Sequence, residues 1–261
     1  GASSTPAFLK TIQKIASCEG IERGSRVGLR SESRYRAEGI HKIPAANRVN
    51  PSTSIKSQFL PPRWTADHLV ETYFSEVCKT FTILHEPTFR KEYERLWRPT
   101  SLQPPTLWIC LANSVFALGA LFSDRLRAEE SESISETFCS QAMELCHLDT
   151  LEEGSLTMVQ ALLLMGHYLH IKRASRCWHV FGLAIRAAQG LGLHLNDINN
   201  KHSVVEREVR KRCWSGCLVM DTMLAMTFGR PTMISPKHYE NAKLPEPVDD
   251  PCITPPASLE D

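Results

Sequence analysis

Two pairs of side chains have the spacing of metal ligands on one face of a helix. His167 and His170 are three residues apart, and Cys213 and Cys217 are four residues apart. Either spacing can direct two ligands at one zinc ion. Each pair supplies two ligands rather than four, however, and both pairs lie within apolar stripes. The pattern favours side chains packed in a core over a metal site, and we expect no bound zinc and no cofactor in this chain.

The sequence contains no motif that arranges catalytic groups. It has no G-x-S-x-G elbow, no H-E-x-x-H pair, no phosphate-binding glycine loop and no G-x-G-x-x-G fingerprint. Nine cysteines and ten histidines are present, but no spacing places a nucleophile beside a base. We therefore assign no catalytic residues and expect that the protein is not an enzyme.

Asp221 is the most informative polar residue, because it shares a predicted helix face with Trp214 and Cys217. A half-buried carboxylate needs a cationic or backbone partner, and Arg186 and Arg230 are the cationic candidates. Two interpretations remain open: an ion pair that fixes the helix against its neighbours, or a polar group in an effector pocket. The candidate members of this network or pocket are Gln160, His167, Trp178, Arg186, Trp214, Asp221 and Arg230.

Three successive helices are predicted to position these residues. Ser155 can cap the first helix, and Gly192 can end the second in the left-handed conformation. Ser203 and Glu206 form an S-x-x-E capping box at the start of the third helix, which stops at Gly229 before a proline.

Further helices are predicted upstream. Thr65 can cap one, Pro87 suits the start of another, and a capping box of Ser133 and Glu136 predicts a third from about residue 133. The apolar run at 106–123 is shorter than the roughly 20 residues of a membrane span and predicts a buried core helix. Because period-two alternation is rare, we expect an all-α fold of antiparallel helix pairs and no membrane contact.

The rest of the chain suggests flexible flanks around one domain. We expect a short amphipathic helix at 1–18, a basic flexible linker at 19–58, a helical domain at 59–247 and a proline-rich tail at 248–261. The formal net charge of +1 gives no overall attraction to nucleic acid. Scattered cysteines indicate a reducing, intracellular environment. Five linker arginines could make weak phosphate contacts, although a solvated tether is the favoured alternative: Arg23, Arg26, Arg30, Arg34 and Arg36.

Several strings between Phe59 and Pro247 occur in a distinctive order: LPPRWTADHLVETYFSEVCKTFTILHEPTFRKEY, VQALLLMGHYL, WHVFGLAIR, LGLH, EVRKRCW, Asp221, GRP and KLPEP. This order resembles the middle homology, or regulatory, region of fungal zinc-cluster (Zn2Cys6) transcription factors, the fungal-specific transcription factor domain of the xylanolytic activator type. The chain departs from the usual family pattern at Cys213-Trp214, where two aromatics are common, and at Thr222, where an arginine is common.

The resemblance implies a regulatory, effector-sensing and interaction domain of a nuclear fungal RNA polymerase II transcription factor. The C-x2-C-x6-C cluster of the family's DNA-binding module is absent from this sequence, so zinc is expected only in that missing module. The expected partners are a small-molecule effector, the remainder of the transcription factor, coregulators or a second copy, with DNA bound only through the missing module. The alternative is a non-catalytic helical scaffold subunit of a chromatin-bound complex.

The family's domain is generally longer than the matched region, so the resemblance also implies a domain that is incomplete at its C-terminal side. The predicted helices at 106–123 and 155–170 are apolar on most of their circumference and need neighbours on several sides. We therefore expect one apolar face to remain uncovered and to form the regulatory surface.

Overall fold

The computed structural model describes these residues: 60–98, 104–146, 154–195, 202–235, 237, 244–247 and 250–253. All of them belong to residues 50–261, one of the two units into which the chain divides. The predicted helix at 1–18 and the linker at 19–58, with its five arginines, lie outside the described residues.

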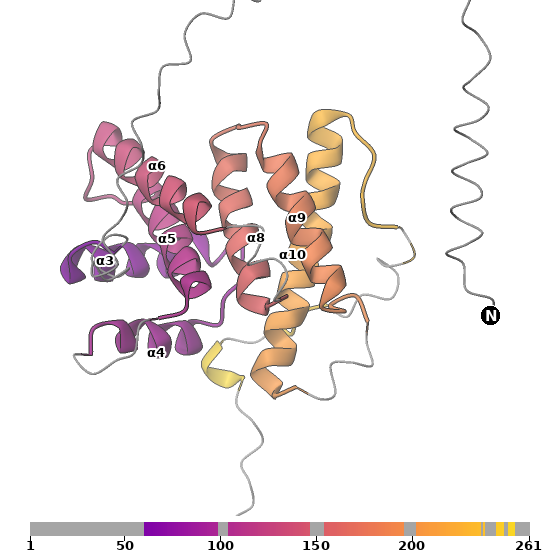
Figure 1. The fold of residues 1–261 in the computed structure, drawn as a ribbon, viewed down its shortest axis with the longest axis horizontal. Coiled ribbons are helices and arrows are strands. Elements are labelled where there is room, and N and C mark those ends of the chain that lie inside the picture. Colours follow the sequence, from indigo (N-terminus) through magenta and orange to yellow (C-terminus); the bar gives the residue numbers. More distant parts are fainter. Residues whose placement is uncertain are drawn as a thin grey trace, which may run out of the picture. The chain divides into compact units, whose positions relative to one another are not determined.

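Every regular element in the described part of the chain is helical, which confirms the all-α prediction (Figure 1). The α-helices are α3 (Arg63–Thr72), α4 (Glu86–Leu96), α5 (Thr106–Leu121), α6 (Ala128–Leu145), α8 (Leu156–Ile171), α9 (Cys177–Gly190) and α10 (Val204–Phe228). A π-helical turn, Tyr73–Val77, continues α3, and a 3₁₀ turn, Asp250–Cys252, follows much later. None of these helices combines the length and the apolar composition that a membrane crossing needs.

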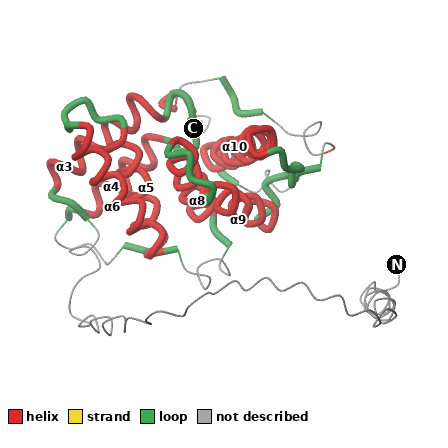
Figure 2. Tube along the Cα trace, turned by 90° about the horizontal axis from the view of Figure 1, so that it is seen from above, coloured by secondary structure: helices red, strands yellow, loops and turns green. Residues whose placement is uncertain are grey.

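Two central helices organise the core. α5 packs against α3, α6 and α8, while α8 also packs against α9 and α10; Figures 1 and 2 show α3 to α6 grouped on one side and α8 to α10 on the other. Every residue of α5 from Ile109 to Ala120 is buried, as its apolar run predicts. Between Met158 and Leu169 of α8, only Gln160 and His167 are partly exposed. Gln160 and His167 thus interrupt an otherwise buried stretch of α8.

The helix ends predicted around the candidate residues are confirmed. The side chain of Ser155 accepts a hydrogen bond from the backbone N–H of Met158 at 3.2 Å. Ser203 does the same for Glu206, also at 3.2 Å. Gly192 and Gly229 both have positive φ, at 69° and 62°, which side chains with a Cβ rarely adopt.

Two predicted helix starts are wrong. α6 begins at Ala128, so Ser133 lies inside the helix, where its carbonyl accepts a hydrogen bond from Thr137 Oγ1. The glutamates at 129 and 130 favour the earlier start, because acidic side chains stabilise the positive end of a helix. α3 likewise begins at Arg63, directly after Pro62, rather than at a Thr65 cap.

The close crossing of α3 and α5 depends on Gly119. A Cβ added there would lie 2.1 Å from the backbone oxygen of Leu69, which leaves no room for any side chain. Gly166 has a similar role between α8 and α9, where an added Cβ would meet the ring of Phe181 at 2.8 Å. These small residues let the helix axes approach, as expected for packed faces.

Candidate functional site

The first half of α10 carries buried charges. Arg212 and Glu208 are each about 4% exposed and lie one helical turn apart, with Arg212 Nε 3.2 Å from Glu208 Oε1. Arg212 Nη1 is 2.6 Å from Asp250 Oδ1 and donates a hydrogen bond to the backbone oxygen of Leu84 at 3.1 Å. A buried cation is tolerated only when it is paired and hydrogen-bonded. Arg212 is therefore the centre of a compensated network.

Asp250 connects this network to α4. Its Oδ2 accepts a hydrogen bond from the backbone N–H of Glu86, the first residue of α4, at 2.7 Å. Its backbone oxygen is 3.1 Å from His85 Nε2. The first N–H groups of a helix need external acceptors and favour negative charge. Asp250 thus caps α4 and neutralises Arg212 at the same time.

The segment that includes Asp250 forms a C-terminal strap, defined as residues 244–247 and 250–253. The backbone N–H of Glu246 donates to Glu208 Oε1 at 3.1 Å, and Lys211 Nζ contacts Glu246 Oε1 at 2.7 Å. Lys211 lowers the pKa of the Glu246 carboxyl through this hydrogen bond. The strap therefore joins the KLPEP string to the EVRKRCW string. It also extends past residue 247, where the sequence predicts the domain to end, because Ile253 is buried.

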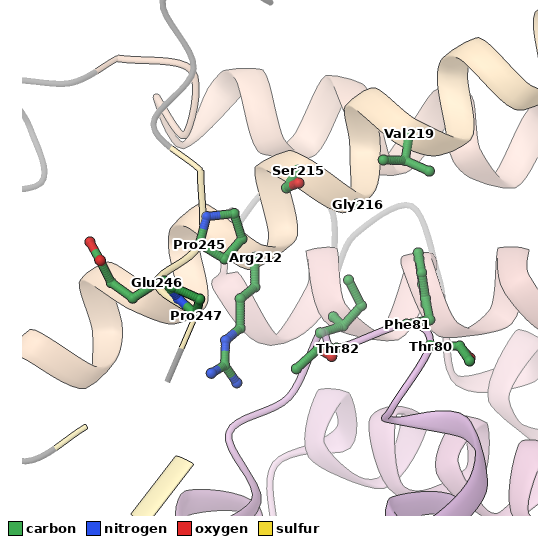
Figure 3. Close-up of a pocket in the computed structure, with 11 residues that line it drawn as sticks. Thr80, Phe81, Thr82, Arg212, Ser215, Gly216, Val219, Pro245, Glu246 and Pro247 are labelled. Carbon is green, nitrogen blue, oxygen red and sulfur yellow. The ribbon is translucent and has the colours of Figure 1, made fainter. Parts of the chain in front are cut away.

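A pocket of about 380 Å³ lies beside the strap (Figure 3). We call it the strap pocket. Figure 3 shows α10 on one side, the loop of residues 80–83 on another and the strap on a third, with Arg212 reaching between the strap and the loop. Its lining consists of Thr80, Phe81, Thr82, Ile83, Arg212, Ser215, Gly216, Val219, Pro245, Glu246 and Pro247. Gly216 keeps the α10 wall flat, since an added Cβ there would meet Ile83 Cδ1 at 2.7 Å.

A second pocket, of about 400 Å³, is formed by α4, α5, α8 and the start of α10. Gln160 is the only predicted site residue in its lining, and its Nε2 is 3.4 Å from the backbone oxygen of Ile83. Trp108 and Phe89 supply stacked aromatic rings, 5.5 Å apart, to the same pocket. This pocket is walled by packed helices, without strap residues in its lining.

Asp221 is 2% exposed and its partners are backbone amides. Its two carboxylate oxygens accept hydrogen bonds from the N–H groups of Met233 at 3.0 Å and Ile234 at 2.8 Å. The two predicted arginine partners lie elsewhere: Arg186 contacts Gln189, and the Arg230 guanidinium stacks over the ring of Trp178. The ion-pair hypothesis is therefore wrong in its partner, and the carboxylate fixes the chain that follows α10.

Three of the remaining candidate residues make separate aromatic contacts. Arg230 lies 4.9 Å from the ring centroid of Trp178, next to the end of α10. His167 stacks on Phe81 with ring centroids 4.5 Å apart, and burial lowers its pKa to about 4. Trp214 is buried, with its ring 5.8 Å from that of His194.

The seven predicted residues therefore do not form one pocket. Gln160 lines the second pocket, while His167 lies outside the lining of the strap pocket and stacks on Phe81, which is part of that lining. Arg212, Glu208 and Asp250, which sequence analysis did not select, form the best-connected polar group. The one local signal for them is the four-residue spacing of Glu208 and Arg212.

The His167–His170 and Cys213–Cys217 pairs, for which the sequence favours a core role, gain no third ligand in the part of the chain that the structure describes. No group of three or more histidine, cysteine, aspartate or glutamate side chains there could hold a metal ion. Cys213 and Cys217 are fully buried, and burial raises the pKa of Cys213 to about 12 and that of Cys217 as well. Both thiols are thus protonated core residues, which is unfavourable for a ligand.

Comparison with known proteins gives a consistent result. Residues 70–259 match the model of a family described as the fungal-specific transcription factor domain. An uncharacterized transcriptional regulatory protein of Schizosaccharomyces pombe is 33% identical over 204 residues, which cover 75% of this chain and 25% of that protein. Transcription factor FBD3 of Gibberella moniliformis is 29% identical, with coverage of 82% and 29%.

The Zn(2)-C6 fungal-type transcription factor mpsB of Macrophomina phaseolina is 28% identical, with coverage of 67% of this chain and 25% of that protein. The chain thus spans between 25% and 29% of the length of these three relatives. No solved structure matches the chain.

Proposed function

Because the chain belongs to the fungal-specific transcription factor domain family, we propose that it is the regulatory, effector-sensing and interaction domain of a fungal RNA polymerase II transcription factor. In this proposal the protein acts in the nucleus, catalyses no reaction, and depends on a zinc-cluster module outside this chain for sequence-specific DNA binding. The domain itself converts the binding of an effector into a change in its contacts with the rest of the regulator or with coregulators.

The strap pocket is the observation that supports effector sensing. Its volume of about 380 Å³ lies within the roughly 300–1,000 Å³ that small-molecule sites occupy. One wall is α10, and another is the strap, which Glu208, Lys211 and Arg212 hold by charge and hydrogen bonds. In this proposal the strap either packs against α10, as in the structure, or moves away from it. A ligand that contacts both walls has a higher affinity for the first form, and this difference in affinity shifts the equilibrium between the two forms.

The lining suggests the class of effector. Phe81, Ile83 and Val219 present apolar surface, while the hydroxyl groups of nearby threonines and Ser215 can exchange hydrogen bonds with a ligand. Arg212 is already neutralised by two carboxylates, so it adds little attraction for a highly charged anion. A small, mostly apolar metabolite with a few hydrogen-bonding groups fits these properties.

A thermal-shift screen of the 261-residue chain against metabolites tests the proposal, because a ligand that binds only the folded state raises Tm. Val219→Trp should fill the pocket and abolish the shift. Met226→Trp is the matched control, since Met226 is 75% exposed on the same helix and lies outside the lining. A shift that Met226→Trp removes, or that Val219→Trp leaves intact, would contradict an effector in this pocket.

A scaffold role in a chromatin-bound complex is the second candidate, and an exposed apolar stripe on α10 favours it. Val219, Met223 and Met226 are 49%, 41% and 75% exposed at positions that share one helix face. A scaffold would show no ligand-dependent shift but would lose a protein partner when Met223 and Met226 are replaced by serine. Retained partner binding in that double variant would argue against the scaffold.

The same proposal predicts weak DNA binding by the chain itself. The basic residues between Arg23 and Arg36 can contact phosphate without reading bases, so binding should be salt-sensitive and independent of sequence. Titration onto labelled duplexes measures this. Sub-micromolar binding that discriminates between sequences at physiological salt would show that the chain carries its own DNA-reading surface.

A further inference from the structure

One face of α6 places two cysteines on either side of a cysteine from α5. Cys139, Ala142 and Cys146 follow one another at three- and four-residue intervals, so they share a helix face. Cys110 of α5 lies opposite this face, with its Sγ 3.2 Å from the backbone oxygen of Ala142. Cys146 lies one helical turn after Ala142 on the face that Cys110 meets, and its own Sγ is 3.9 Å from Met158 Sδ of α8.

The three thiols differ in their access to solvent. Cys110 is completely buried and Cys139 is 4% exposed, whereas Cys146 is partly exposed. Cys146 is also the residue that follows the last turn of α6, with φ −91° and ψ 79°, outside the helical conformation. A small oxidant can therefore reach Cys146 directly, and the backbone there is not held by a continuing helix.

We propose that Cys146 is a peroxide-sensitive residue and that it forms a reversible disulfide with Cys110. This modification site is separate from the strap pocket, and it does not depend on the effector proposal. It makes the domain responsive to the redox state of its surroundings as well as to a ligand.

The chemistry balances in two steps. The Cys146 thiolate attacks one oxygen of hydrogen peroxide, which breaks the O–O bond and yields a sulfenic acid and hydroxide. The Cys110 sulfur then attacks the Cys146 sulfur, the S–O bond breaks, and the Cys110 proton leaves with the hydroxyl group as water. Peroxide is reduced and the two thiols are oxidised. A cellular dithiol reverses the step by thiol–disulfide exchange.

The electrostatics favour Cys146 as the first residue to react. The hydrogen bond with the Cys110 thiol lowers the pKa of Cys146, because the Cys110 S–H can turn from the Ala142 carbonyl toward the Cys146 thiolate. The pKa of Cys110 is raised, first by the same hydrogen bond and then by burial. Burial raises the pKa of Cys139 to about 12. Thiolate character and exposure, which together control cysteine reactivity, thus coincide only at Cys146 of these three.

The disulfide would tie the end of α6 to the central helix α5. It closes a loop from residue 110 to residue 146, and such a cross-link reduces the conformational entropy of the unfolded chain. The oxidised domain should therefore have a higher Tm than the reduced domain.

Peptide mapping of the full chain tests the proposal. The reduced protein is treated with a small excess of hydrogen peroxide, alkylated and digested without reductant. We expect the intact mass to fall by that of two hydrogen atoms, a linked Cys110–Cys146 peptide as the main product, and a rise in Tm that dithiothreitol reverses. Dimedone present during oxidation should label Cys146 at early times.

Three variants make the test specific. Cys139→Ser, on the same face of α6, should keep the linked peptide and the rise in Tm. Cys146→Ser should lose both. Cys110→Ala should leave a persistent dimedone adduct on Cys146, and the early label in the wild-type chain gives the same information if that variant does not fold. Labelling of Cys252 or Cys139 without labelling of Cys146, or a disulfide that survives Cys146→Ser, would overturn the proposal.

Discussion

The first half of α10 carries a buried ion pair, whereas the second half carries apolar side chains that are exposed. In the first half, Glu208 and Arg212 are charged but about 4% exposed. In the second half, Val219 and Met226 are apolar but 49% and 75% exposed. The helix is continuous from Val204 to Phe228, so the difference comes from what packs against each half.

This comparison shows where the helix depends on distant parts of the chain. The strap and α4 approach the first half and supply partners for its charges. Among the described residues, no segment packs over the exposed Met223 and Met226 of the second half in this way. Because an unpaired buried charge costs several kcal/mol and an exposed apolar side chain costs little, substitutions in the two halves should have very different effects on stability.

The largest effect is expected for Arg212→Ala. The substitution leaves Glu208 and Asp250 without their buried counter-ion, and removal of one partner from a buried pair costs about 3–5 kcal/mol. Urea unfolding measures the loss. Arg95→Ala is the matched control: Arg95 and its partner Glu92 are 53% and 38% exposed, so the cost should stay below about 1 kcal/mol. Equal effects for the two variants would mean that the Arg212 network is open to water.

Asp221→Ala should have the next largest effect, because Asp221 is the buried charge that the second half contains and backbone amides are its partners. The variant loses two charge-assisted hydrogen bonds from the N–H groups of Met233 and Ile234, which corresponds to a loss of about 2–4 kcal/mol in the free energy of unfolding. Asp221→Asn keeps one acceptor oxygen and should lose about half as much. A loss under about 1 kcal/mol for Asp221→Ala would show that water replaces the carboxylate.

The pH dependence of stability should report on His167 of α8. This side chain stacks on Phe81, which lines the strap pocket beside α10. Burial, followed by the nearby His170, lowers the pKa of His167 from 6.5 to about 4 in the folded state. The unfolded chain therefore binds an extra proton between pH 6.5 and pH 4, and stability falls as the pH drops through this window. Since one pKa unit corresponds to about 1.4 kcal/mol and His167 is partly exposed, the loss should reach about 2–3 kcal/mol.

Unfolding midpoints measured from pH 7 to pH 4 test this expectation. His167→Gln should flatten the slope in that window, while His179→Gln, on the exposed surface of α9, should leave it unchanged. An unchanged slope in His167→Gln would mean that other groups control the acid sensitivity of the fold.

Much of the fold could be predicted from the sequence because the signals are local. The caps at Ser155 and Ser203 and the left-handed Gly192 and Gly229 each involve neighbours within a few residues. The Ser133 capping box failed for the same reason: a matching local pattern lay inside a helix whose start was determined by the acidic turn before it. Local patterns predict helices well, but competing caps require tertiary contacts to decide between them.

The candidate site was harder to predict because its contacts are distant in the chain. Asp250 lies 38 residues after Arg212 in a proline-rich segment, and nothing in its surroundings indicates a buried partner. Asp221 was correctly identified as a residue needing a partner, yet two backbone amides can satisfy a carboxylate as well as an arginine does. A buried carboxylate in the sequence thus predicts that some hydrogen-bonding partner is present, but it does not predict which group that partner is.

The smallest effect on stability is expected for Met226→Ser, which tests the second half of α10 directly. Met226 is 75% exposed, so in the monomer the substitution should change the free energy of unfolding by less than about 0.5 kcal/mol. Leu224→Ser is the matched control, because Leu224 is 1% exposed on the opposite face and should lose about 3 kcal/mol or more. Light scattering on the same samples reports association. If the stripe contacts a second copy, Met226→Ser should shift the protein toward monomer and its stability should depend on protein concentration. A loss above about 1 kcal/mol that is independent of concentration would instead mean that another part of the same chain covers Met226, and the contrast between the two halves of α10 would then disappear.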